Sequence, residues 1–226
     1  AFYRADASAF PMSLEATSAY VWLQQAFLAF HAAMFMENEI FESISNGNIV
    51  YELCRPVNIY NMWFSRNLAK RVSSAALRCM PILLIAVFLP APYGLMPPVS
   101  FPVFLLFLFS LLLWILVTVS FCMLIYMASF FTISHAGIRM AAFCAVDFFS
   151  GAVIPLPFFP DRIRQIFELL PFAAMQNVPL RIYSGDLSGS AMWQALFLQC
   201  FWFLIMAGTG RAINAIAMKK VTVQGG

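Results

Sequence analysis

The sequence predicts an all-α integral membrane protein, a polytopic bundle of helices that cross the bilayer. Hydrophobic residues make up 62% of the 226 residues and charged residues only 10%, whereas soluble domains carry about 25% charged residues. The apolar runs are long and continuous rather than alternating, which favours helices over a β-barrel. Helices also satisfy their own backbone N–H and C=O groups, as a hydrocarbon environment requires.

Five apolar segments are expected to cross the membrane within one transmembrane domain that covers residues 1–226. They are residues 14–36, 63–89, 103–131, 138–154 and 191–213. The second begins as an amphipathic helix with four cations on one side, named here the basic arc: Arg66, Lys70, Arg71 and Arg78. We expect the basic arc to contact lipid headgroups, or else an acidic protein surface.

The distribution of lysine and arginine predicts the orientation. Loops on one side of the membrane carry most of these cations, and the richer side is expected to be cytoplasmic. This places the loop 37–61 and the C-terminus inside, and the region 155–190 outside. Five crossings then leave Ala1 outside, which fits a further helix upstream and six helices in all.

The loop 37–61 is too polar for lipid, yet part of it is amphipathic. Ile40, Phe41 and Ile44 share one side of a predicted helix, and Asn46-Gly47 is a typical C-cap. Such a helix can insert its apolar edge into a groove of a partner protein. On periodicity alone, a helix resting in the headgroup layer is an equal alternative.

Asp147 lies near the middle of its span, where an ionised carboxylate costs roughly 2.5–3.5 kcal/mol. It is a candidate polar point on a substrate path that suits a cation, and the alternative is a hydrogen-bonded carboxyl in helix packing. Trp22, Gln25 and Phe148 are the further candidates for this path. The spacing of His31 and of the five cysteines does not indicate a metal site.

After Pro160, Asp161 is expected to be the N-cap of a short amphipathic helix that Pro171 ends. Five segments in order then carry a resemblance: ISNGNIVYELCRPV at 44–57, FSGAVIPLPFFP at 149–160, LPF at 170–172, PLRIYSG at 179–185 and VTVQGG at 221–226. Together they resemble the type-2 ATP-binding-cassette (ABC) permeases, and among these the subgroup of short six-helix permeases.

The resemblance implies a permease subunit of an ATP-driven exporter in the plasma membrane. Its expected partners are a second permease, homologous or identical, two ATPase subunits and membrane lipid, with no nucleic acid. ATP and Mg would lie on the ATPase, and the sequence itself contains no phosphate-binding loop of the GxxxxGK[S/T] type. No catalytic residue and no cofactor is expected on this chain.

The resemblance also favours ATPase docking by the loop 37–61, and re-entry of the outer region 155–190 into the membrane as a roof over the path. A helix lying flat on the outer surface is the alternative for that region. The expected coupling residues are Glu39, Ile40, Phe41, Ile44, Asn46, Gly47 and Arg55.

The substrate is expected to be lipophilic or amphipathic, which suits a chain rich in Phe, Met and Trp. The alternative for these residues is packing between helices and lipid, and composition does not separate the two. Two other functions stay open, both using Asp147: an intramembrane enzyme and a secondary transporter. No nucleophile motif accompanies His31 and His135, and the sequence shows no inverted repeats or interrupted helices.

Overall fold

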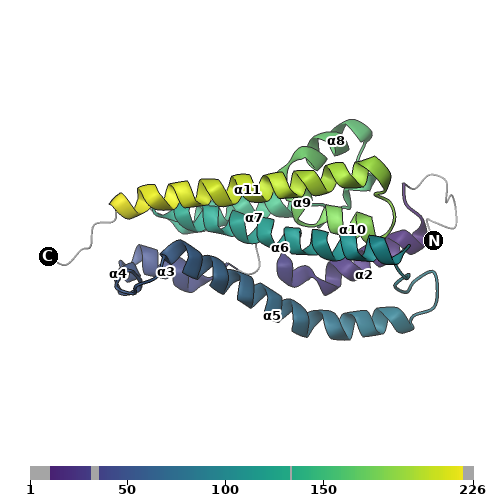
Figure 1. Cartoon of the computed structure of the whole chain (residues 1–226), viewed down its shortest axis with the longest axis horizontal. Coiled ribbons are helices and arrows are strands. Elements are labelled where there is room, and N and C mark those ends of the chain that lie inside the picture. Colours follow the sequence, from purple (N-terminus) through teal and green to yellow (C-terminus); the bar gives the residue numbers. More distant parts are fainter. Residues whose placement is uncertain (1–10, 32–35, 133, 221–226) are drawn as a thin grey trace.

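The computed structural model describes residues 11–31, 36–132 and 134–220, and their regular secondary structure is helical throughout (Figure 1). The all-helical fold class is therefore confirmed. The elements are α2 (Leu14–Ala26), η2 (Leu28–Phe30), α3 (Asn38–Ser45), α4 (Ile49–Leu53), α5 (Ile59–Phe88), α6 (Phe101–Ser129), α7 (His135–Phe149), η4 (Leu156–Phe158), α8 (Asp161–Leu169), α9 (Pro171–Met175), α10 (Asn177–Tyr183) and α11 (Gly189–Lys220).

Within the described residues, three helices are long and apolar enough to cross a membrane: α5, α6 and the segment Gly189–Lys219 of α11. They correspond to the second, third and fifth predicted spans. Helix α5 begins at Ile59, four residues earlier than expected, because the side chain of Asn58 caps it by accepting a hydrogen bond from Asn61 N at 3.1 Å.

The first and fourth predicted spans form shorter helices. Helix α2 has 13 residues and α7 has 15, so at 1.5 Å per residue they are about 20 and 22 Å long. Residues 14–36 do not form the single helix expected, because α2 ends at Ala26 and His31 is extended after the 3-10 turn η2. Residues 32–35 lie outside the described part.

Helix α6 lies at the centre of the bundle. It packs against α5, α10, α11 and α9, and the large side chains of Trp114, Met123 and Tyr126 are fully buried. A helix that is apolar on all sides belongs in such a position. The other long helices keep one exposed apolar side, as lipid contact requires.

The region 155–190 folds back against the bundle. Helices α9 and α10 are buried and pack on α6, and α8 remains exposed outside them. Gln199 of α11 fixes this arrangement, because its Nε2 donates to Ala174 O at 2.8 Å and its Oε1 accepts from Ser110 Oγ at 2.7 Å. Asp161 is the first helical residue of α8, and the cap position belongs to Pro160, so the predicted N-cap is one residue off.

Candidate functional site

The predicted coupling loop contains two short helices, α3 and α4, at the opposite end of the bundle from α8 and α10 (Figure 1). Asn46 is the C-cap of α3, and its N–H donates to Glu42 O at 2.9 Å. Gly47 follows with φ of 73°, the left-handed conformation that ends many helices. The expected C-cap at Asn46-Gly47 is therefore present.

The apolar side of α3 is covered by the chain itself. Ile40 and Phe41 are fully buried. The Phe41 ring stacks on His135 with ring centroids 5.0 Å apart and lies 5.0 Å from the Tyr126 ring. Ile44 is half-buried against the same core. Ile40 and Phe41 are therefore not free to enter an ATPase groove in this arrangement, and the coupling role expected of them stays a prediction.

The polar side of α3 is tied to the long helices. Glu37 Oε2 lies 2.7 Å from Arg66 Nε, and Glu39 also pairs with Arg66 on α5. The N–H of Glu37 donates to Tyr126 Oη on α6 at 2.7 Å. Arg139 of α7 donates to Asn38 at the start of α3, at 2.5 Å. Helix α3 is thus bonded to α5, α6 and α7 at the same time.

A different surface of this loop stays exposed. Tyr51, Leu53 and Val57 project apolar side chains outward, with Tyr51 75% exposed, and Arg55 lies among them. These four residues are named here the α4 surface. Glu39, Asn46 and Gly47 are exposed beside α3. Arg55 was among the expected coupling residues, whereas Tyr51, Leu53 and Val57 were not. All four lie in the segment 44–57 that carries the resemblance.

Most of the basic arc has partners within the chain. Arg66 pairs with Glu37 and Glu39, and Arg78 Nε donates to Gln25 O at 3.2 Å. Arg71 is fully buried. Arg71 is therefore not positioned to contact headgroups in this structure, whereas Arg66, Lys70 and Arg78 are exposed, and the Lys70 side chain has no bond to another described residue.

Arg71 bonds to the backbone where the first segment is interrupted. Its Nη1 donates to Phe30 O at 3.1 Å and to His31 O at 2.8 Å, and its Nε donates to Asn67 Oδ1 at 2.7 Å. The last carbonyl groups of a helix have no partner within it. Within the membrane these carbonyl groups need a hydrogen-bond donor from elsewhere in the protein, and non-helical backbone is tolerated where the protein supplies that donor. Arg71 supplies this donor. The interruption itself was not predicted from the sequence.

Asp147 has a partner from the same interrupted segment. His31 Nε2 lies 2.5 Å from Asp147 Oδ1, and their side chains are 5% and 29% exposed. The open side of Asp147 faces a shallow groove along α7 that is lined by Phe143, Cys144, Phe148 and Val153. Two polar groups that the sequence analysis treated separately therefore form one site.

The other predicted path residues, Trp22 and Gln25, have different partners. Trp22 Nε1 donates to Tyr93 O at 2.8 Å in the hairpin after α5, and Gln25 is exposed on α2. Among the described residues, no hydrogen bond or ring contact joins either of them to Asp147 or Phe148. Asp147 therefore bonds to His31 and lines one groove with Phe148, whereas Trp22 and Gln25 have other partners.

Comparison with known protein families supplies an independent finding. Residues 13–225 match the model of a family described as "ABC-2 family transporter protein". The comparisons with curated proteins and with solved structures gave no match.

Proposed function

Because the chain belongs to the ABC-2 family of transporters, we propose that it is the membrane-spanning permease subunit of an ATP-driven exporter. Membership of this family makes it a transport subunit of a membrane transporter rather than a catalytic one. Its proposed partners are two ATPase subunits, which hold ATP and Mg, and a second permease, homologous or identical. The proposed location is the plasma membrane.

The observation that supports this proposal best is the position of α3. Energy from ATP is released outside the membrane, so it can reach the spans only through a rigid contact. Helix α3 is bonded to α5 through Arg66, to α6 through Tyr126 and to α7 through Arg139. A push on α3 would therefore move three helices together.

The α4 surface is the proposed docking site for the ATPase. Exposed apolar side chains next to polar ones are typical of protein interfaces, and Tyr51, Leu53 and Val57 are exposed beside Arg55. The α4 surface follows α3 directly in the chain, across Asn46-Gly47. In this proposal Ile40 and Phe41 transmit the force inside the chain, and the α4 surface receives it.

The proposed topology has five crossings in this chain, with α3 and α4 inside and α8 to α10 outside. Three of these crossings would be the long helices α5, α6 and α11. The other two would be the interrupted segment 14–36 and the segment 138–154. Arg71 supports the first of these, since it bonds the carbonyl groups exposed by the interruption.

The proposed substrate is lipophilic or amphipathic, and Asp147 would favour one with a positive charge. Its half-buried carboxylate opens on a groove with aromatic walls, and such walls attract cations as well as apolar groups. The His31–Asp147 pair also favours a second candidate, a secondary transporter driven by protons, because histidine and carboxylate pairs carry protons in many membrane proteins.

Purification with an ATPase of the ABC class and with a second permease, encoded beside this chain, tests the proposal. The isolated chain should bind no nucleotide, whereas the assembled complex in proteoliposomes should hydrolyse ATP and export substrate. The same complex with an inactivated ATPase is the control and should transport nothing. Nucleotide binding by the isolated, folded chain would contradict the proposal. Transport driven by a proton gradient without ATP would favour the secondary transporter.

A further inference from the structure

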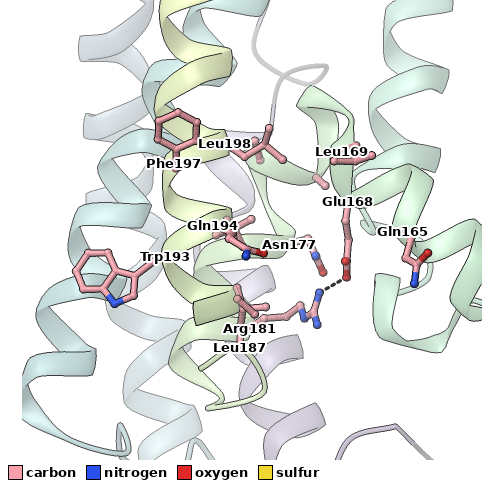
Figure 2. Close-up of a pocket in the computed structure, with 15 residues that line it drawn as sticks. Gln165, Glu168, Leu169, Asn177, Arg181, Leu187, Trp193, Gln194, Phe197 and Leu198 are labelled. Carbon is pink, nitrogen blue, oxygen red and sulfur yellow. Dashed lines mark hydrogen bonds and ion pairs between the residues drawn. The ribbon is translucent and has the colours of Figure 1, made fainter. Parts of the chain in front are cut away.

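A pocket of about 710 Å³ opens between α8, α9, α10 and the start of α11 (Figure 2). It lies at the end of the bundle away from α3 and α4 (Figure 1), and neither ATPase docking nor the Asp147 site uses it. Pockets of this size bury most of a small amphipathic molecule.

The walls of the pocket are mainly apolar. Leu169, Val178, Leu187, Phe197 and Leu198 contribute the bulk of the lining, and the space exists because four positions are alanine: Ala173, Ala174, Ala191 and Ala195. Two hydrogen bonds from α11 position the backbone that lines the pocket. Trp202 Nε1 donates to Leu169 O at 3.0 Å, and Gln199 Nε2 donates to Ala174 O at 2.8 Å.

The pocket has a distinct polar end. Arg181 and Glu168 both line it and bond to each other (Figure 2). Arg181 Nε also lies 2.5 Å from Asp186 Oδ2, and Arg164 Nε lies 3.8 Å from Glu168 Oε1. Burial opposes the charge of Arg181, but Asp186 and Glu168 outweigh it, so the pKa of Arg181 is raised above its ordinary value.

Amide groups complete this end. Gln165 on α8 and Gln194 on α11 are exposed and line the pocket. Neither side chain has a hydrogen bond to another residue of the described part, so both can bond to a ligand. Trp193, 60% exposed at the same level of α11, is the kind of residue that lies at the boundary between hydrocarbon and headgroups.

The charges on the lining select the kind of headgroup. Glu168 and Arg181 line the pocket as a bonded pair of opposite charges, so a ligand with a single charge of either sign meets one attracting and one repelling group. A zwitterion can place its ammonium beside Glu168 and its phosphate beside Arg181 and the two amides. The apolar walls then accommodate the upper part of the acyl chains.

We propose that this pocket binds a zwitterionic phospholipid of the outer leaflet, with its headgroup beside the bonded pair Glu168–Arg181 and its chains along α11. This site goes beyond the proposed export function and rests on it only for the choice of leaflet. Because binding needs no ATPase and no transported substrate, its failure would leave the export proposal untouched.

Native mass spectrometry of the purified full chain tests the site, after exchange with equal amounts of phosphatidylcholine and phosphatidylglycerol. The unmodified chain should retain one phosphatidylcholine in preference. Ala195→Phe fills the pocket without touching its charges, so the retained lipid should fall about tenfold. Ala212→Phe, at an exposed position near the other end of α11, is the matched control and should retain lipid normally.

Glu168→Gln tests the headgroup selectivity. It keeps a polar side chain but removes the negative charge, so the preference should move towards phosphatidylglycerol by about fivefold. Equal retention in Ala195→Phe and Ala212→Phe would overturn the site. An unchanged headgroup preference in Glu168→Gln would overturn the role of the charges. A lipid-free dimer that cross-links between copies from position 197, in the pocket wall, would show that a second copy covers this face instead.

Discussion

Arg71 is a fully buried cation whose acceptors include the carbonyl oxygens of Phe30 and His31, the side chain of Asn67 and the sulfur of Cys122. Charges are expensive inside a membrane bundle and are usually bonded to carboxylates or to backbone carbonyl groups. Here the guanidinium, with its several donors, bonds to two adjacent carbonyl groups that follow the end of α2. It thereby connects α5 to the interruption after α2.

Replacing Arg71 by methionine should destabilise the chain by about 1–3 kcal/mol, because the Phe30 and His31 carbonyl groups lose their buried donor. The matched control is Lys70→Met at the adjacent exposed position, which should change stability by less than about 0.5 kcal/mol. Thermal unfolding of the purified chains in one detergent measures both. Equal unfolding temperatures for the two variants would show that Arg71 does not hold the interruption.

At Asp147, charge and hydrogen bonding can be separated. Asp147→Asn keeps a partner for His31, so the chain should keep its stability while transport of a cationic substrate falls. Asp147→Ala leaves His31 buried without that partner, and the free energy of unfolding should drop by about 1–3 kcal/mol. Transport assays and thermal unfolding of both variants check this. Full transport by Asp147→Asn would mean that the carboxylate serves packing alone.

Helix α3 behaves as an internal connector between the long helices α5 and α6 and the shorter helix α7. Its ring contacts through Phe41 to Tyr126 and His135, together with the bonds of Glu37 and Arg66, leave little freedom to move independently. Because interfaces packed in this way rearrange as units, a displacement of α3 is passed to the spans rather than absorbed.

Phe41→Ala and Tyr51→Ala should therefore have different effects. Removing the buried Phe41 ring should cost about 3–5 kcal/mol of stability, the usual range for a buried phenylalanine. Removing the exposed Tyr51 ring should leave stability unchanged and weaken the complex with the ATPase. Thermal unfolding and co-purification separate the two effects. If Tyr51→Ala loses stability and Phe41→Ala does not, the assignment of the two surfaces is reversed.

Some of these elements could be predicted from the sequence and others could not. Hydropathy located α6 and α11, because long apolar runs leave few alternatives in a membrane, whereas α5 also needed the periodicity of its basic arc. Periodicity predicted which side of α3 is apolar, but it could not say that α6 and α7 cover Ile40 and Phe41. The interruption after Ala26 escaped detection because the residue that satisfies it, Arg71, lies 40 positions from His31 in the chain. Tertiary partners of this kind leave no local signal.

For the whole molecule, the proposed topology assigns each end of the bundle to one side of the membrane. Cysteine introduced at position 164 in α8 should react with a membrane-impermeant label on intact cells, whereas cysteine at position 219 in α11 should react only after the cells are opened. Position 164 lies outside the apolar spans, and position 219 is the last residue of the segment Gly189–Lys219. Labelling of 219 but not 164 on intact cells would reverse the orientation and with it the assignment of α3 and α4 to the cytoplasm.

The central claim is that the chain receives the work of an ATPase through the α4 surface. A photo-activated cross-linking residue at position 51, in the assembled complex with the ATPase, measures this contact directly. We predict a cross-link from position 51 to the ATPase, and none from position 109, which is exposed on α6 away from this loop. An intact, active complex that gives no cross-link from position 51 would contradict the account.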